Sequence, residues 1–233
     1  MRNSLTKITH LIMAVTLMIL SLQLSAADPV SYDDPWEDVN RAVFDFNDAL
    51  DTFTLKPIAK GYNYITPKPV QSMVGNFFSN LGEVRNAANA GLQLKPKEAF
   101  TSLSRLAINS TIGMLGLIDV ASPMGIEQKY NDFGLTFAHW GAPSGPYVVL
   151  PLLGSSTLRD GLGRLPDTYS NPITYHEPER DRWIAWGLGL VNTRAKLLGA
   201  EELIVGDRYT FIRDTYLQRR EFLITGEQPE DDF

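Results

Sequence analysis

Residues Phe133 to Leu158 have the sequence FGLTFAHWGAPSGPYVVLPLLGSSTL, which is 26 residues without Asp, Glu, Lys or Arg. A charge-free run of that length is typical of a transmembrane helix. This run contains Pro143, Pro146 and Pro151, and each interior proline would cost a helix about 3 kcal/mol through a lost hydrogen bond and a steric clash. The run is therefore apolar enough for lipid but too interrupted to cross a bilayer as one helix. We expect a re-entrant or pore-lining element, because irregular backbone at membrane depth needs protein or a water-filled cavity around it.

The first residues of the chain have the pattern of a secretory signal. Arg2 and Lys7 precede an apolar run, and small residues end that run at Ala27. We expect cleavage after Ala27, and an uncleaved anchor is the alternative. The expected organisation is a signal peptide over residues 1–27, one helical domain over residues 28–225 and an acidic tail over residues 226–233.

Composition restricts the class of protein. The chain has no cysteine, which excludes disulfides and cysteine zinc sites, and leaves no thiol for N-terminal lipid attachment. Removing the signal lowers the Lys and Arg count from 21 to 19 against 27 Asp and Glu, a net charge of −8. An acidic chain is disfavoured as a nucleic-acid binder and as a polybasic membrane protein. We expect apolar surface to hold it on lipid.

Helical periodicity dominates the chain on both sides of the interrupted run. Asp34 before Pro35 predicts a capped helix of about 18 residues, whose apolar side chains recur every three or four positions as far as Phe53. Val148–Leu150 can pair briefly as a strand, although prolines flank it. We predict a mainly α fold. Further helices are expected to begin near Pro57, Val70, Pro96, Thr157, Arg182 and Asp207.

Catalytic and metal-binding patterns are weak. The residues after the signal contain only His139 and His176, which do not form a set of metal ligands. Ser144, His139 and Asp160 would be the nucleophile, base and acid of a hydrolase, but Gly141–Gly145 departs from the G-x-S-x-G elbow. We therefore expect no enzyme activity, no cofactor and no metal.

A set of motifs in a fixed order carries a family resemblance from about Asp34 to Leu223. The motifs are Asp34–Arg41, Asn76–Leu81, Ile108–Gly113, Leu117–Ala121, Asp132–Thr136, Trp140–Gly141, Gly145–Pro151, Ser156–Asp160, Thr193–Ala195 and Gln218–Arg220. Together these motifs are similar to the MlaA (VacJ) family, the outer-membrane component of the Mla lipid-transport system.

The resemblance implies a specific function. It implies a single helical domain, ring-shaped around an amphipathic channel and embedded in the membrane interface on the periplasmic face of the outer membrane. Phospholipids that have strayed into the outer leaflet would pass through this channel to a periplasmic lipid carrier, MlaC, which maintains outer-membrane lipid asymmetry. A trimeric porin is an implied partner. Many members carry a lipidated cysteine, which this chain lacks.

Candidate site residues follow from combining the resemblance with the two charge-free runs. A channel for lipid needs an apolar wall for the tails and polar groups for the headgroup, so the candidates are mixed. The lipid-channel candidates are Asn109, Ser110, Thr111, Ile112, Met114, Leu115, Leu117, Ile118, Gly141, Gly145, Tyr147, Val148, Val149, Leu150, Leu152 and Leu153. The membrane-interface candidates are Trp36, Phe44, Phe77, Phe78, Trp183 and Trp186.

Two alternatives differ from a lipid conduit in class. One is a periplasmic adaptor that clamps a porin and moves no lipid. The other, the weakest, is a secreted lipid hydrolase. Transfer of phospholipid to a carrier separates the adaptor from the conduit.

Overall fold

The computed structural model describes residues 34–204 and 206–227, and its chain is mainly helical, as predicted. The expected signal peptide and the last six residues of the expected tail lie outside this part of the chain. The α-helices are α2 (Glu37–Leu50), α3 (Lys56–Ile65), α4 (Lys68–Leu92), α5 (Pro96–Thr111), α6 (Phe133–His139), α7 (Leu158–Tyr169), α8 (Glu179–Leu197) and α9 (Arg208–Thr225). The other elements are strands β1 (Tyr147–Leu150) and β2 (Gly154–Thr157), a π-helix (Asp51–Leu55), and 3-10 turns at Ser122–Met124, Pro172–Tyr175 and Ala200–Leu203.

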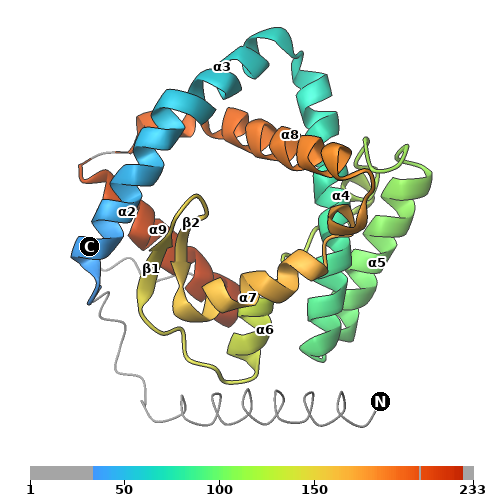
Figure 1. Ribbon diagram of the computed structural model, residues 1–233. Helices are drawn as coiled ribbons and strands as arrows, with labels where there is room; N and C mark the ends of the chain where they lie inside the picture. The colour runs from blue at the N-terminus through green and yellow to red at the C-terminus, as the bar shows by residue number, and fades with distance from the viewer. Residues whose placement is uncertain (1–33, 205, 228–233) are drawn as a thin grey trace, which may run out of the picture.

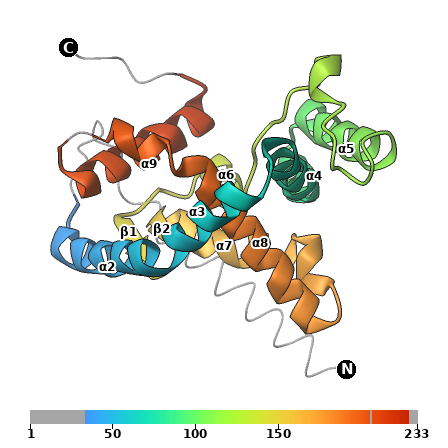
Figure 2. The ribbon, with the colours of Figure 1, turned by 90° about the horizontal axis from the view of Figure 1, so that it is seen from above.

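The helices are arranged as a ring-like frame (Figure 1). In that view α2 and α3 form one side, α8 and the α4–α5 pair form the next, and α7, α9 and the β1–β2 hairpin close the frame. Contacts join α3 to α8, α4 to α8, α6 to α7 and α9 to β2, so the frame is closed by packing and not only by chain connection. Figure 2 shows that α9 and α5 project to one side of this frame, while the start of α8 projects to the other.

One side of the frame is a nearly continuous helical rod. The π-helix joins α2 directly to α3, which widens one turn without interrupting the helix. Its first residue, Asp51, accepts two hydrogen bonds of 2.7 Å from Arg194 on α8. Bidentate pairing of this kind fixes orientation as well as distance, so α8 is held at a defined angle to the rod.

The interface between α4 and α5 is polar. Glu83 is fully buried there and lies 2.7 Å from Arg105 Nε, and Arg105 also pairs with Asp119 at 3.2 Å. Asn109 accepts hydrogen bonds from the backbone N–H groups of Val120 and Ala121 at 2.8 and 3.0 Å. Burial alone would raise the pKa of Asp119, but hydrogen bonds from Ser122 and Asn109 and the nearby Arg105 lower it to about 2. These polar groups hold the loop after α5 against the helix pair.

The charge-free run that opened the sequence analysis folds into a short helix and a hairpin. Asp132 caps α6 by accepting from Leu135 N at 2.8 Å. The chain then turns at Gly141 and Gly145, which have φ of 88° and 67°, and enters β1. β1 and β2 pair antiparallel from Tyr147 opposite Thr157 to Leu150 opposite Gly154. The predicted interruption is thus confirmed.

Three boundaries differ from the sequence predictions. Pro35 lies in a turn instead of the first helical position, and α2 begins at Glu37, because the Asp34 carboxylate accepts from Trp36 N and from Asn40. The helix that was expected to begin near Val70 begins at Lys68 and continues to Leu92, with several of its polar residues buried. β2 was not predicted, because Gly-Ser-Ser-Thr has no apolar alternation and pairs only through its register with β1.

Burial in this chain is inverted relative to a water-soluble domain. Among the described residues nine apolar side chains are buried against twenty polar or charged ones, while thirty-six large apolar side chains are exposed. Apolar residues are normally the most buried type, and large exposed apolar patches mark contact with membrane or protein. Within the described ranges, no helix combines the length and the hydrophobicity that a bilayer crossing requires.

Candidate functional site

A cavity of about 410 Å³ lies inside the frame. Helices α4, α7, α8 and α9, the segment before α6 and the turn of the hairpin all contribute to its wall. Its lining combines charged and apolar side chains. The residues are Leu81, Gly82, Arg85, Tyr130, Asp132, Leu153, Asp160, Arg164, Asp167, Thr168, Asn171, Trp186, Tyr216 and Arg220.

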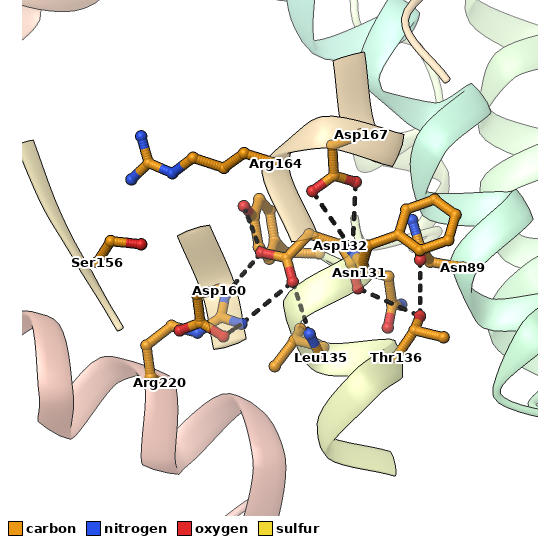
Figure 3. A network of polar contacts seen from close by, with 12 residues as sticks. Asn89, Asn131, Asp132, Leu135, Thr136, Ser156, Asp160, Arg164, Asp167 and Arg220 are labelled. Carbon is orange, nitrogen blue, oxygen red and sulfur yellow. Dashed lines mark hydrogen bonds and ion pairs between the residues drawn. The ribbon is translucent and has the colours of Figure 1, made fainter. Parts of the chain in front are cut away.

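Arg220 is the centre of a buried ionic network in this wall (Figure 3). Its guanidinium donates to Asp132 at 2.6 and 3.1 Å and to Asp160 at 2.9 Å. The Tyr216 hydroxyl donates to the other oxygen of Asp160 at 2.8 Å. One arginine of α9 therefore joins the beginning of α6 to the beginning of α7, and both carboxylates are satisfied from the same helix.

The electrostatics of this network follow from burial and pairing. Burial by itself would raise the pKa of Asp132, but the hydrogen bonds and the positive charge of Arg220 lower it overall. Burial raises the pKa of Tyr216, and the adjacent Asp160 carboxylate raises it further. Asp132 and Arg220 are therefore both ionised at neutral pH, and the Tyr216 hydroxyl beside them is neutral.

Two glycines allow α6 and α7 to approach closely enough for this pairing. A Cβ on Gly163 would lie 2.6 Å from the backbone nitrogen of Gly134, and a Cβ on Gly134 would lie 2.5 Å from the Asp160 carboxylate. No real Cβ makes such contacts with backbone, so these positions require glycine. The close contact of α6 and α7 at these glycines brings Asp132 and Asp160 near enough for the Arg220 guanidinium to bind both.

Asp167 lies near the end of α7, on the helix face that also carries Asp160. It accepts from Phe133 N at 3.2 Å, which satisfies a backbone donor in the first turn of α6. Burial raises the pKa of Asp167 to about 6, the nearby Asp132 adds to the rise, and Arg85 opposes it. The pKa of the Asp167 carboxyl is thus moved toward neutral pH.

Arg164 connects the cavity wall to the hairpin. Its guanidinium donates to the carbonyl of Leu153 at 3.0 Å and to that of Ser155 at 2.8 Å. On the far edge of the hairpin, Asn40 of α2 bonds Tyr147 O and Val149 N, and Asn47 bonds Leu150 O and Leu152 N, all within 3.0 Å. The hairpin is thus held from both sides, with Leu153 at the cavity.

The structure places the predicted channel residues in two regions. Leu153 lies in the cavity lining. Tyr147 and Val149 belong to β1, and their side chains are buried in a cluster with Tyr209 of α9. The predicted loop after α5 is exposed, and its apolar side chains Ile112, Met114, Leu115 and Ile118 are all at least 45% accessible. Asn109 and Ser110 support that loop, and Thr111 bonds its own helix. Leu117 O accepts from Asn76 at 3.1 Å. Val148, Leu150, Leu152 and the glycines Gly141 and Gly145 belong to the hairpin and its approach.

The predicted interface residues divide into two groups. Trp36, Trp183 and Trp186 are exposed, and Trp186 also lines the cavity. Phe44 packs edge-on against Tyr209 at 5.6 Å, and Phe77 and Phe78 pack against each other at 5.4 Å. The phenylalanines therefore support the frame.

Sequence reasoning missed the charged wall of the cavity. Asp160, Arg164 and Asp167 recur at spacings of four and three, which places them on one face of the helix that was expected after Thr157. That spacing was the available signal, since Thr157 does cap α7 through Asp160 N at 3.2 Å. Arg85 and Arg220 carry no comparable signal, because only the tertiary fold brings them to α7. The hydrolase set is not assembled through Asp160, whose oxygens accept from Arg159, Tyr216 and Arg220.

Comparison with known proteins adds a consistent set of matches. The sequence profile of a family described as MlaA lipoprotein matches residues 32–223. The Escherichia coli K12 protein named intermembrane phospholipid transport system lipoprotein MlaA is 31% identical over 224 residues, which are 91% of this chain and 86% of that protein. An uncharacterized protein of Rickettsia felis is 36% identical over 192 residues, 81% of this chain and 76% of its own length. A solved chain described under "Structural basis for maintenance of bacterial outer membrane lipid asymmetry" superposes with a TM-score of 0.71 at 35% identity, covering 83% of this chain and 100% of that one.

Proposed function

Because the chain belongs to the MlaA lipoprotein family, we propose that it removes mislocalised phospholipid from the outer leaflet of the outer membrane and passes it through the cavity to a periplasmic carrier. The observation that carries this proposal is the inverted burial: an apolar exterior surrounds a charged internal cavity. An apolar exterior is stable in lipid and a charged interior is stable around a polar headgroup. This combination suits a conduit that accepts an amphiphile from the bilayer.

The physical task is to move a headgroup without exposing acyl chains to water. Each methylene moved from bilayer to water costs about 0.8 kcal/mol. Leu81, Leu153 and Trp186 offer apolar surface to the tails, beside the charged groups that replace water around the headgroup. The mixed lining therefore lowers the cost of moving the acyl chains and the cost of removing water from the headgroup, along one path.

The membrane contact is assigned to the exposed apolar side chains of the frame. Phe53, Ile65 and Trp183 are among the most exposed of these, at 81%, 76% and 65%. Each such side chain contributes roughly 1.5–3 kcal/mol when it leaves water. Several together hold the ring in the periplasmic leaflet of the outer membrane, and the exposed loop at Ile112–Ile118 and the hairpin at Tyr147–Leu153 extend this surface as parts of the channel wall. A trimeric porin and an MlaC-like carrier are the proposed protein partners.

A plugged cavity tests this function. Gly82 lines the cavity, and a Cβ added there meets nothing within 4 Å, so the Gly82→Phe side chain can leave α4 unclashed and extend into the passage. Gly61 on α3 has equally open surroundings and lies outside the lining, so Gly61→Phe is the matched control. Each protein is reconstituted in vesicles with labelled phospholipid, and the lipid recovered on the added periplasmic carrier is measured.

The expected result is efficient loading of the carrier by the native chain and by Gly61→Phe, and at least a tenfold loss with Gly82→Phe. No loading by the native chain, with porin binding intact, would identify the adaptor instead. Equal loading by both variants would contradict passage through the cavity.

A further inference from the structure

Most arginines of this protein have a carboxylate partner, and the exceptions gather in one place. The described ranges contain twelve arginines, of which nine form an ion pair within those ranges. The three without a carboxylate partner there are Arg85, Arg164 and Arg219. Arg85 and Arg164 line the cavity from α4 and α7, and Arg219 faces the ring of Tyr130, which also lines it.

Arg85 and Arg219 share that ring. Their guanidinium carbons lie 4.9 and 5.7 Å from the Tyr130 centroid, and neither guanidinium has a carboxylate within salt-bridge distance in the described chain. Cation–π attraction offsets part of the repulsion. The Arg85 Nε is buried without a hydrogen-bond partner among the described residues, which costs stability as long as no acceptor reaches it. Both features favour a bound anion.

The cavity also holds a carboxylate that has no cationic partner within salt-bridge distance in the described chain. Asp167 accepts from the backbone N–H of Phe133 at 3.2 Å, which is a neutral donor. Figure 3 shows the Arg164 side chain extending from α7 toward the strand of Ser156, away from Asp167. Arg164 and Asp167 therefore do not neutralise each other, and each is available to a separate charge on a ligand.

The charges of the whole lining balance. Arg85, Arg164 and Arg220 face Asp132, Asp160 and Asp167, and Arg220 is occupied by the first two carboxylates. The guanidinium groups of Arg85 and Arg164 and the carboxylate of Asp167 therefore have no salt-bridge partner in the lining. A ligand that is itself neutral overall, with separated positive and negative groups, satisfies them all, whereas a purely anionic ligand leaves Asp167 facing a like charge.

We propose that the cavity is a headgroup site for phospholipids that carry both a phosphate and a primary ammonium, with Arg85 and Arg164 binding the phosphate and Asp167 facing the ammonium. Guanidinium groups match phosphate oxygens in geometry and charge. The two hydrogen bonds of Arg164 to the hairpin use two of its five N–H donors, which leaves others for the ligand. This proposal rests on the proposed transport function and names the lipid class that the passage prefers.

The test compares two lipids that differ only in headgroup. Vesicles contain labelled phosphatidylethanolamine or labelled phosphatidylglycerol, and the initial rate of carrier loading is measured. The proteins compared are the native chain, the single variants Asp167→Asn and Arg182→Gln, and the double variant that combines Arg85→Gln with Arg164→Gln. Arg182 is a surface arginine of α8 paired with Glu179 outside the lining, and serves as the charge-matched control. Soluble glycerophosphoethanolamine and inorganic phosphate are added separately as competitors of the native chain.

We expect the native chain and Arg182→Gln to load phosphatidylethanolamine at least threefold faster than phosphatidylglycerol. Asp167→Asn should remove that preference while transfer persists, and the double arginine variant should slow both lipids about tenfold. Glycerophosphoethanolamine should compete more strongly than inorganic phosphate, a result that needs no variant to fold.

Equal rates for both lipids in the native chain, or equal competition by inorganic phosphate, would overturn the headgroup assignment while leaving transport intact. Absence of any loading by the native chain would instead overturn the transport function, and the headgroup site with it.

Discussion

At the scale of single residues, the site depends on positions that permit close approach and on charges that remain ionised out of bulk water. Gly134 and Gly163 let α6 and α7 meet backbone to backbone, and Arg220 then bridges the carboxylates that this contact brings together. The Arg220 pairs are nearly fully buried, so removing one partner would leave an uncompensated charge.

Gly163→Ala tests the close approach. Its Cβ would lie 2.6 Å from one backbone atom and 3.0 Å from another, so α6 has to shift, and we expect the free energy of unfolding to fall by about 1–3 kcal/mol. Gly187→Ala on α8 meets nothing within 4 Å and is the control, with an expected gain of about 0.5–1 kcal/mol from helix propensity. Urea unfolding in detergent measures both, and equal stability of the two variants would contradict the packing argument.

Asp167→Asn tests the cost of the unpaired carboxylate. The pKa of Asp167 is raised from 3.8 to about 6, so the folded chain holds the proton more tightly than the unfolded chain, and the ionised group opposes folding at neutral pH. Arg85 and Asn89 of α4, Asp132 and Phe133 N at α6, and Arg220 of α9 surround it. We expect the variant to gain on the order of 1 kcal/mol above pH 6, after allowance for solvent screening.

The same gain should shrink as pH falls through the interval between about 6 and 4, because the native carboxyl is then protonated in both states. Urea unfolding across this interval provides the measurement. A gain that is constant with pH would show that the carboxylate charge is not its cause.

At the scale of elements, the hairpin is the part of the cavity wall that is held by side chains alone. Asn40 and Asn47, two helical turns apart on α2, supply amide groups to the free edge of β1, and Arg164 holds the other strand. Because the amide of Asn47 bonds both Leu150 O and Leu152 N, it replaces a neighbouring strand at the turn.

Asn47→Ala should therefore loosen the hairpin turn. We expect amide hydrogen exchange at Leu152 to quicken by at least tenfold, with little change in α2 itself. Asp45→Ala, at an exposed position of the same helix, is the control and should leave that exchange rate unchanged. Unchanged protection of Leu152 in Asn47→Ala would show that the turn is stable without α2.

Gly145→Ala addresses the approach to the hairpin. Gly145 has a φ of 67°, and its Cβ would lie 3.1 Å from the Leu158 side chain, so alanine is strained there by backbone conformation and by contact. We expect lipid flux to change more than overall stability, which outer-leaflet phospholipid in cells measures. Normal lipid asymmetry at full expression would count against a role of this turn in transport.

The sequence predicts the helices well where local chemistry marks their ends. Pro57, Pro96 and Thr157 each stand within one residue of a helix start, because proline and a capping hydroxyl act on their own turn. Apolar periodicity does not mark the second half of α4, because the face buried there is Glu83, Asn86 and Asn89. The charged cavity wall was missed for another reason: its partners come from helices far apart in sequence.

At the scale of the whole molecule, the distribution of polarity matches the proposed position of the ring in lipid. Many buried polar groups are satisfied by one another, as in the Glu83–Arg105 pair, and the large apolar side chains are mostly exposed. A surface of that kind is stable where water is absent from the outside of the protein. A position in lipid also fits two predictions from the sequence: the interrupted charge-free run and the secretory signal.

Phe53→Glu combined with Ile65→Glu should weaken membrane attachment. Both side chains are strongly exposed, at 81% and 76%, and each loses roughly 1.5–3 kcal/mol of transfer free energy, so binding to vesicles should fall by at least a hundredfold. Thr215→Glu with Gln218→Glu adds the same charge at exposed polar positions of α9 and is the control. Flotation with vesicles measures both, and equal flotation would contradict attachment through the π-helix and α3.

The most direct measurement of lipid passage through the ring uses the absence of native cysteine. Gly82→Cys places a single thiol in the cavity, and Gly61→Cys places one outside it. Attaching a bulky disulfide-forming reagent to the first protein should stop the loading of phospholipid onto the carrier, and reduction should restore it, while the second protein should transfer lipid throughout. Undiminished transfer by the fully labelled Gly82→Cys protein would contradict a route through the cavity.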